Sequence, residues 1–129
     1  MLMVRLGKSL TWLAGIEICS LNDPDLNALA KKTCVLISTV GPFARYGEPV
    51  VKACAENGTH YLDVTGEVPW VLKMIRKYES AAASSGAIII PQIGIESAPS
   101  DLVTWTLASL ARKHFSCGIG QTIVASEMK

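Results

Sequence analysis

The stretch Thr33–Pro49, with the sequence TCVLISTVGPFARYGEP, passes from an apolar run through a Gly-Pro turn into a second run of helical character. Its aliphatic segment Val35–Ile37 has no polar interruption, which is typical of a strand covered on both faces in a parallel sheet. Gly47 and Pro49 are typical of a helix N-cap and a first helical turn. Because ligands in open α/β sheets bind at the carboxyl ends of strands, the turn between these elements is a candidate site.

Apolar segments alternate with amphipathic ones on both sides of this stretch. Asn57-Gly58 and Ser84–Gly86 are typical helix ends, since glycine readily adopts the left-handed conformation of a C-cap. Beyond residue 20 we predict strands over residues 34–39, 60–64, 87–91 and 121–125, and helices over residues 23–32, 48–57, 69–85 and 100–113. The inward side chains expected on the last two helices are Val71, Ile75, Tyr78, Ala82, Val103, Leu107, Leu110 and Ala111.

The predicted strands begin near residues 34, 60 and 87, so each strand-helix unit is about 26 residues long. This spacing predicts an α/β fold, in which right-handed crossovers build a parallel sheet with flanking helices. Such strands end at one edge of the sheet, where polar and glycine residues collect. These residues are Ser38, Thr39, Gly41, Thr65, Gly66, Glu67, Gln92, Gly94, Glu96 and Ser97. Each one also suits ordinary turn and cap chemistry, and only their convergence indicates a site.

Composition narrows the class of protein. The chain of 129 residues is 50% hydrophobic and 18% charged, which is typical of a folded domain. Its net charge of +1 creates no positive electrostatic potential strong enough to attract nucleic acid. The four cysteines have no spacing typical of zinc, so no metal site is expected. Cys34 and Cys54 lie in apolar runs, where we expect their side chains to be buried and to act as small hydrophobic groups. Free thiols of this kind lead us to expect a soluble intracellular protein.

Two strings resemble a known family. STVGPFARYGEPVVKACAENGTHYLDVTGE and AIIIPQIGIESAPSDL are similar to the later half of the nucleotide-binding domain in saccharopine dehydrogenase-like oxidoreductases, which include trans-acting enoyl reductases. The resemblance implies a Rossmann-like domain for NAD or NADP, in which the Gly41-Pro42 turn lies beside the ribose and nicotinamide. The cofactor-binding residues that it implies are Ser38, Thr39, Val40, Gly41, Pro42, Tyr46, Asp63, Thr65, Gly66 and Glu67.

The chain also departs from the pattern of this family. It has no Gly-rich turn of the GxxGxxG kind, the motif that anchors the pyrophosphate at a helix N-terminus. Residues 10–14 and 16–19 both read as strands with only Gly15 between them, although parallel neighbours need a crossover of a dozen residues or more. We therefore expect residues 1–14 to be a truncated remnant and residues 15–129 to be a partial Rossmann-like domain that lacks the first βαβ unit. The strand at residues 34–39 then becomes an exposed edge.

Two functions from different classes remain open. The first is a nucleotide-binding domain of an NAD(P)-dependent oxidoreductase, for which the resemblance implies a dinucleotide, a lipid-like substrate in full-length relatives, and association with lipid droplets, membranes or mitochondria. The second is a non-catalytic α/β module that binds a partner or itself through the exposed strand. Residue by residue, Asp63 and Glu67 suit acid-base chemistry, while Glu67 also suits a helix cap before Pro69. Tyr46 suits either a ribose contact or packing on neighbouring turn residues.

Overall fold

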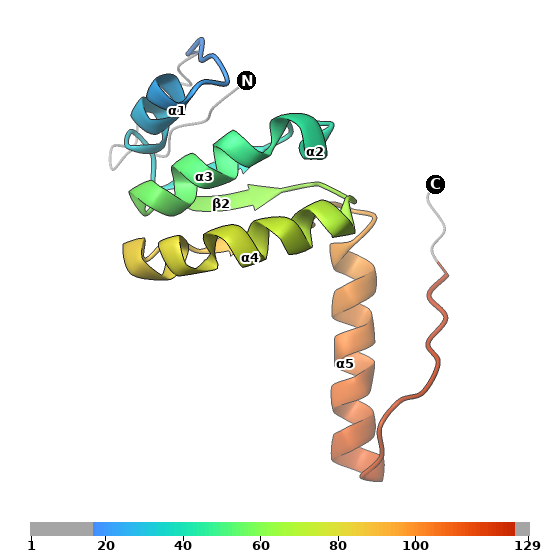
Figure 1. The fold of residues 1–129 in the computed structure, drawn as a ribbon. Coiled ribbons are helices and arrows are strands. Elements are labelled where there is room, and N and C mark those ends of the chain that lie inside the picture. The colour runs from blue at the N-terminus through green and yellow to red at the C-terminus, as the bar shows by residue number, and fades with distance from the viewer. Residues whose placement is uncertain (1–16, 126–129) are drawn as a thin grey trace, which may run out of the picture. The chain divides into compact units, whose positions relative to one another are not determined.

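A computed structural model describes residues 17–125 and divides the chain into two compact units, with the boundary in the sequence between Ile93 and Gly94. The first unit holds a three-stranded parallel sheet and four helices, drawn from blue to yellow in Figure 1. The second unit holds one long helix. The predicted α/β class is confirmed by the first unit, whose elements are α1 (Asp23–Ala30), β1 (Val35–Ser38), α2 (Phe43–Tyr46), α3 (Glu48–Asn57), β2 (His60–Asp63), α4 (Val68–Ser85) and β3 (Ile89–Ile90).

The sheet has the strand order β1-β2-β3, and both pairs of neighbours are parallel. Leu36 is paired with Tyr61 and Ser38 with Asp63, and all four side chains are buried. Between them Ile37 is 60% exposed, so within the described residues only one face of β1 is covered. The prediction of a strand covered on both faces is wrong here, because the helices that pack on this sheet lie on a single side.

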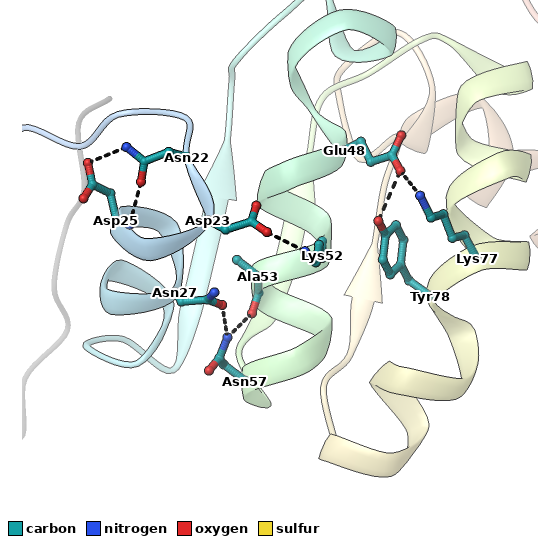
Figure 2. Close-up of polar contacts among 10 residues, drawn as sticks. All are labelled: Asn22, Asp23, Asp25, Asn27, Glu48, Lys52, Ala53, Asn57, Lys77 and Tyr78. Atoms are coloured by element: carbon teal, nitrogen blue, oxygen red, sulfur yellow. Dashed lines mark hydrogen bonds and ion pairs between the residues drawn. The ribbon is translucent and has the colours of Figure 1, made fainter.

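The core lies between the sheet and the helices α1, α3 and α4, of which α3 and α4 run alongside β2 in Figure 1. Its largest fully buried side chains include Tyr61, Leu26, Val50 and Val51. The helix α1 begins as predicted, since the Asn22 side chain accepts a hydrogen bond of 2.9 Å from the backbone N–H of Asp25. A polar clasp, in which Asn57 donates to Asn27 Oδ1, links α3 to α1 (Figure 2).

Both predicted glycine caps are confirmed. Gly58 ends α3 with a φ of 73°, and Gly86 ends α4 with a φ of 78°. The inward face predicted for α4 is confirmed for Val71, Tyr78 and Ala82 but wrong for Ile75, which is 47% exposed. Trp70 and Met74 are buried instead, so the buried stripe of α4 runs through positions 70, 74, 78 and 82.

The second unit differs from its prediction. The helix α5 (Ala98–Phe115) contains the predicted range, yet none of its residues is buried, and Val103, Leu107 and Leu110 are about half exposed. Its apolar stripe faces no second packed layer within the described residues. Residues 121–125 form no strand, and neither do residues 17–19, since neither segment has a hydrogen-bonded neighbour strand. The strand predicted at residues 10–14 lies outside the described residues.

A charged cluster links the start of α3 to the middle of α4 (Figure 2). The Glu48 carboxylate accepts hydrogen bonds from Lys77 and, at 3.2 Å, from Lys73, and the Tyr78 hydroxyl donates to it at 3.1 Å. The hydrogen bond from Lys77 is the main cause that lowers the pKa of Glu48 below its ordinary value of 4.5. Glu48 therefore joins two helices and also places a negative charge in the first turn of α3.

Glu48→Gln is expected to lower stability more at neutral pH than in acid. A carboxyl whose pKa is lower in the folded state than in the unfolded state stabilises the protein above the unfolded pKa. That contribution is lost as the pH falls through the folded pKa, below about 4.5. Urea midpoints of wild type and Glu48→Gln should therefore differ more at pH 7 than at pH 3, with exposed Glu56→Gln as the control. An equal gap at both pH values would contradict this assignment.

The cysteines differ in exposure, and this predicts their reactivity. Cys54 is fully buried as expected, and burial raises the pKa of its thiol to about 12. Cys34 is exposed, contrary to expectation, since it precedes β1 and does not lie within it. At pH 8 a thiol reagent should modify Cys34 and Cys117 in the folded protein but reach Cys54 only after denaturation, because the thiolate is the reactive form. Mass mapping of timed samples checks this, and equal rates at Cys34 and Cys54 would contradict it.

Candidate functional site

The candidate site lies at the carboxyl ends of β1 and β2, where two loops follow neighbouring parallel strands. The chain leaves β1 at Ser38, passes the exposed Gly41 and Pro42, and enters the short helix α2. The sequence predicted a single turn here, because a four-residue helix leaves no periodic signal. Inside this loop the backbone N–H of Gly41 donates to the carbonyl of Thr39 at 3.1 Å. The Gly-Pro turn is thus presented at the edge of the sheet, as predicted.

Glu67 joins the two loops directly. Its Oε1 accepts a hydrogen bond of 2.7 Å from the N–H of Phe43, and its Oε2 accepts one of 2.9 Å from the N–H of Ala44. Glu67 is the N-cap residue of α4, but its side chain makes no hydrogen bond to that helix. The Glu67 side chain does cap a helix, as the sequence suggested, but the helix is α2 and not α4. The capped N–H of Ala44 lies 23 residues earlier in the chain.

Asp63 joins the second loop to the third. Its carboxylate is fully buried, and its Oδ1 accepts from the N–H groups of Thr65 at 3.0 Å and Gln92 at 2.9 Å. The Tyr61 hydroxyl donates to Oδ2 at 2.9 Å, and burial, followed by this carboxylate, raises the pKa of Tyr61. Asp63 thus accepts three hydrogen bonds, all of them from the protein. The sequence could not have indicated Gln92 as a partner, since its contact is made through the backbone.

Aromatic side chains support the first loop from behind. The rings of Phe43 and Trp70 are 5.6 Å apart between centroids and tilted by 45°. Trp70 is buried although its sequence position gave no indication of a role, and an added Cβ at Gly47 would lie 2.7 Å from its Cζ2. Tyr46 is half-buried, and the Arg45 guanidinium lies 5.1 Å above its ring. The sequence did not indicate this contact with Arg45, and the ribose contact of Tyr46 stays a prediction.

The predicted cofactor residues fall into two groups in the structure. The backbone beside both glycines is open: a Cβ at Gly66 would meet nothing within 4 Å, and one at Gly41 would meet only the Phe43 side chain, at 3.6 Å. These are positions where a ligand can approach the main chain closely. The residues available at the surface are Thr39, Val40, Gly41, Pro42, Tyr46, Gly66 and Glu67, and the residues buried beneath them are Ser38, Asp63 and Thr65.

A parallel sheet with helices packed on it, and with open glycine turns at its strand ends, defines a partial Rossmann-like domain. Sequence comparison agrees with this class. Residues 16–90 match the model of the saccharopine dehydrogenase NADP binding domain, and the chain belongs to this family. The family resemblance seen in the sequence is therefore confirmed.

Curated relatives extend this assignment. The chain is 43% identical over 101 residues to a saccharopine dehydrogenase-like oxidoreductase of Bos taurus, covering 77% of this chain and 24% of the relative. It is 39% identical over 98 residues to a lipid droplet localized protein of Caenorhabditis elegans, covering 76% and 23%. A Mycobacterium tuberculosis protein provisionally named a trans-acting enoyl reductase is 44% identical over 88 residues, covering 68% and 21%. The chain thus spans about a quarter of the length of these relatives. No solved structure gave a significant match.

Neither a metal-binding cluster nor a membrane-spanning helix occurs among residues 17–125. Over residues 17–125, no three side chains of the metal-binding types gather closely enough to hold an ion. Among the helices of the same residues, none combines the length and apolarity that crossing a bilayer requires.

Proposed function

We propose that this chain forms the nicotinamide side of an NADP(H) site in an oxidoreductase. The observation that carries the proposal is the pair of open glycine turns, at Gly41 and Gly66, which follow neighbouring parallel strands and are joined by Glu67. Membership of an NADP-binding family supports NADP over NAD as the cofactor. When bound, such a cofactor supplies or accepts a hydride, and the protein supplies position and electrostatics.

In this proposal the exposed residues of the site contact the cofactor, and the buried residues support the loops. The surface residues Thr39, Val40, Gly41, Pro42, Tyr46 and Gly66 would contact the ribose and nicotinamide half of the cofactor. The buried residues Ser38, Asp63 and Thr65 would hold the loops beneath them, because their side chains have no surface to offer a ligand. The names of the enoyl reductase and lipid droplet relatives support a lipid-like substrate and droplet association for the whole protein.

The test is a titration of the purified full chain with NADPH and, separately, with NADH. We expect NADPH fluorescence to change with saturation and the thermal midpoint to rise, because a ligand that binds only the folded state stabilises it. NADPH should bind more tightly than NADH. The absence of saturable binding of either nucleotide would remove the proposal for this chain, and tighter NADH binding would overturn the choice of cofactor.

A second candidate function is supported by the edge strand β1. Val35 is 38% exposed and Ile37 is 60% exposed on a strand with no outer neighbour among the described residues. Apolar edge strands invite pairing with another chain, so this function is self-association in a non-catalytic module. Sedimentation over a range of concentrations tests it. Concentration-dependent dimers that Ile37→Lys abolishes would support the module, and a monomer at every concentration would exclude it.

A further inference from the structure

We propose that Glu67 is a positioning residue, which acts on the nucleotide site through the Gly41-Pro42 turn. The inference rests on the proposed NADP(H) site and assigns a role within it. Both carboxylate oxygens of Glu67 are already engaged, each by one backbone N–H of the loop that follows the turn. A carboxylate that accepts one backbone hydrogen bond at each oxygen fixes the position of both donors, and hence of the loop that carries them.

Hydrogen bonds to Glu67 connect this loop to the loop after β2. Within residues 39–46 the other hydrogen bonds of the described structure are local, such as those from Arg45 and Tyr46 to the carbonyl of Pro42. The two bonds to Glu67 are the ones that reach across to another strand-end loop. Bonds from backbone N–H groups to a charged acceptor are among the stronger hydrogen bonds in proteins. Glu67 therefore supplies the hydrogen bonds that tie this turn to the loop after β2.

Glu67 is itself held in place by a chain of hydrogen bonds. Its backbone N–H donates to Thr65 Oγ1 at 3.1 Å, and the N–H of Thr65 donates to Asp63 Oδ1 at 3.0 Å. The same Asp63 oxygen accepts from the N–H of Gln92. The loops after all three strands are thus linked in series, with the segment between Asp63 and Glu67 as the centre. A displacement of Glu67 would release the first loop without cutting the bond between the second and the third.

An apolar contact from the same helix start supports this clamp. Phe43, whose N–H binds Glu67, packs its ring on Trp70, three residues beyond Glu67 in α4. The start of α4 therefore holds the loop by a polar and an apolar contact side by side. This arrangement predicts local loosening, not global unfolding, when only the carboxylate is changed, because the ring contact remains.

Amide hydrogen exchange of the full chain, followed by NMR, tests the clamp without any cofactor. Glu67→Ala should raise the exchange rates of the Phe43 and Ala44 amides by about tenfold or more, since each loses its acceptor. Glu67→Gln, which keeps one acceptor oxygen, should free one of the two amides, and Glu67→Asp should restore protection in part. The Tyr61 amide, which donates to the carbonyl of Ile88, is the internal reference, and Glu56→Gln is the control variant. Unchanged exchange at Phe43 and Ala44 in Glu67→Ala would overturn the clamp.

NADPH titration of the same variants tests the consequence for the site. We expect Glu67→Ala and Glu67→Gln to weaken binding by about tenfold while the Tyr61 amide stays protected, and Glu67→Asp to recover part of the loss. Faster exchange with unchanged NADPH affinity would overturn the positioning role. If wild type itself does not bind NADPH, the proposed function fails and the positioning role fails with it, and the exchange rates still decide whether Glu67 clamps the loop.

Discussion

Replacing Asp63 by alanine is expected to lower the free energy of unfolding by about 4 kcal/mol. The carboxylate accepts three hydrogen bonds in a site with no solvent access, and each bond contributes roughly 1 to 1.5 kcal/mol. Alanine would leave the N–H groups of Thr65 and Gln92 and the hydroxyl of Tyr61 without an acceptor. Urea unfolding followed by circular dichroism measures the change.

Asp63→Asn is the matched control, and its expected cost is only about 1 kcal/mol. Both backbone N–H groups donate to the same oxygen, Oδ1, so an asparagine that keeps its carbonyl there retains both bonds. The amide nitrogen then faces the Tyr61 hydroxyl, which accepts a hydrogen bond as readily as it donates one. Equal losses for alanine and asparagine would contradict this account and would show that the negative charge, and not the hydrogen-bond geometry, is what matters.

Gly58→Ala is expected to lower the free energy of unfolding by about 3 kcal/mol. Gly58 has a φ of 73°, where a side chain costs about 1 to 2 kcal/mol, and its Cβ would lie 2.9 Å from the backbone oxygen of Ser85. A backbone oxygen cannot move away by a rotamer change as a side chain can. The steric clash therefore adds about 1 to 2 kcal/mol to the loss of unfolding free energy. The clash would push the end of α3 away from the end of α4.

Gly86→Ala separates the two causes. Gly86 has nearly the same φ, 78°, but a Cβ there would meet nothing within 4 Å. Its expected cost is about 1 to 2 kcal/mol, which is the cost of the left-handed conformation alone. The difference between the two variants in chemical denaturation is then the cost of the contact with Ser85. Equal losses would contradict the proposed clash.

The sequence predicted local structure well where a residue acts through its own backbone. The range Glu48–Asn57 of α3 was predicted to the residue, since Pro49 near its start and Gly58 after its end act within one turn of the helix. The alternation of apolar and amphipathic segments along the chain also predicted the positions of β1, β2 and β3. These features follow from steric preferences that each residue carries with it.

Partners that are distant in sequence could not be predicted in the same way. Glu67 was assigned to a helix cap, but the helix that it caps was not foreseen. Ile37 reads as a core residue and is exposed, because periodicity does not say how many faces of a sheet are covered. The stripe on α5 is a similar case, since an apolar face implies a neighbour without identifying it.

The sequence by itself determined the α/β class, the helix ends at Gly58 and Gly86, and the family, because these depend on local conformational preference and on recognisable motifs. Only the tertiary structure decided that Asp63 faces inward and that Glu67 reaches the loop after β1. The physical reason is that a carboxylate satisfies whichever N–H groups the fold brings to it. These N–H groups are distant in sequence from the carboxylate, so the sequence does not identify them before the strands and loops have packed together.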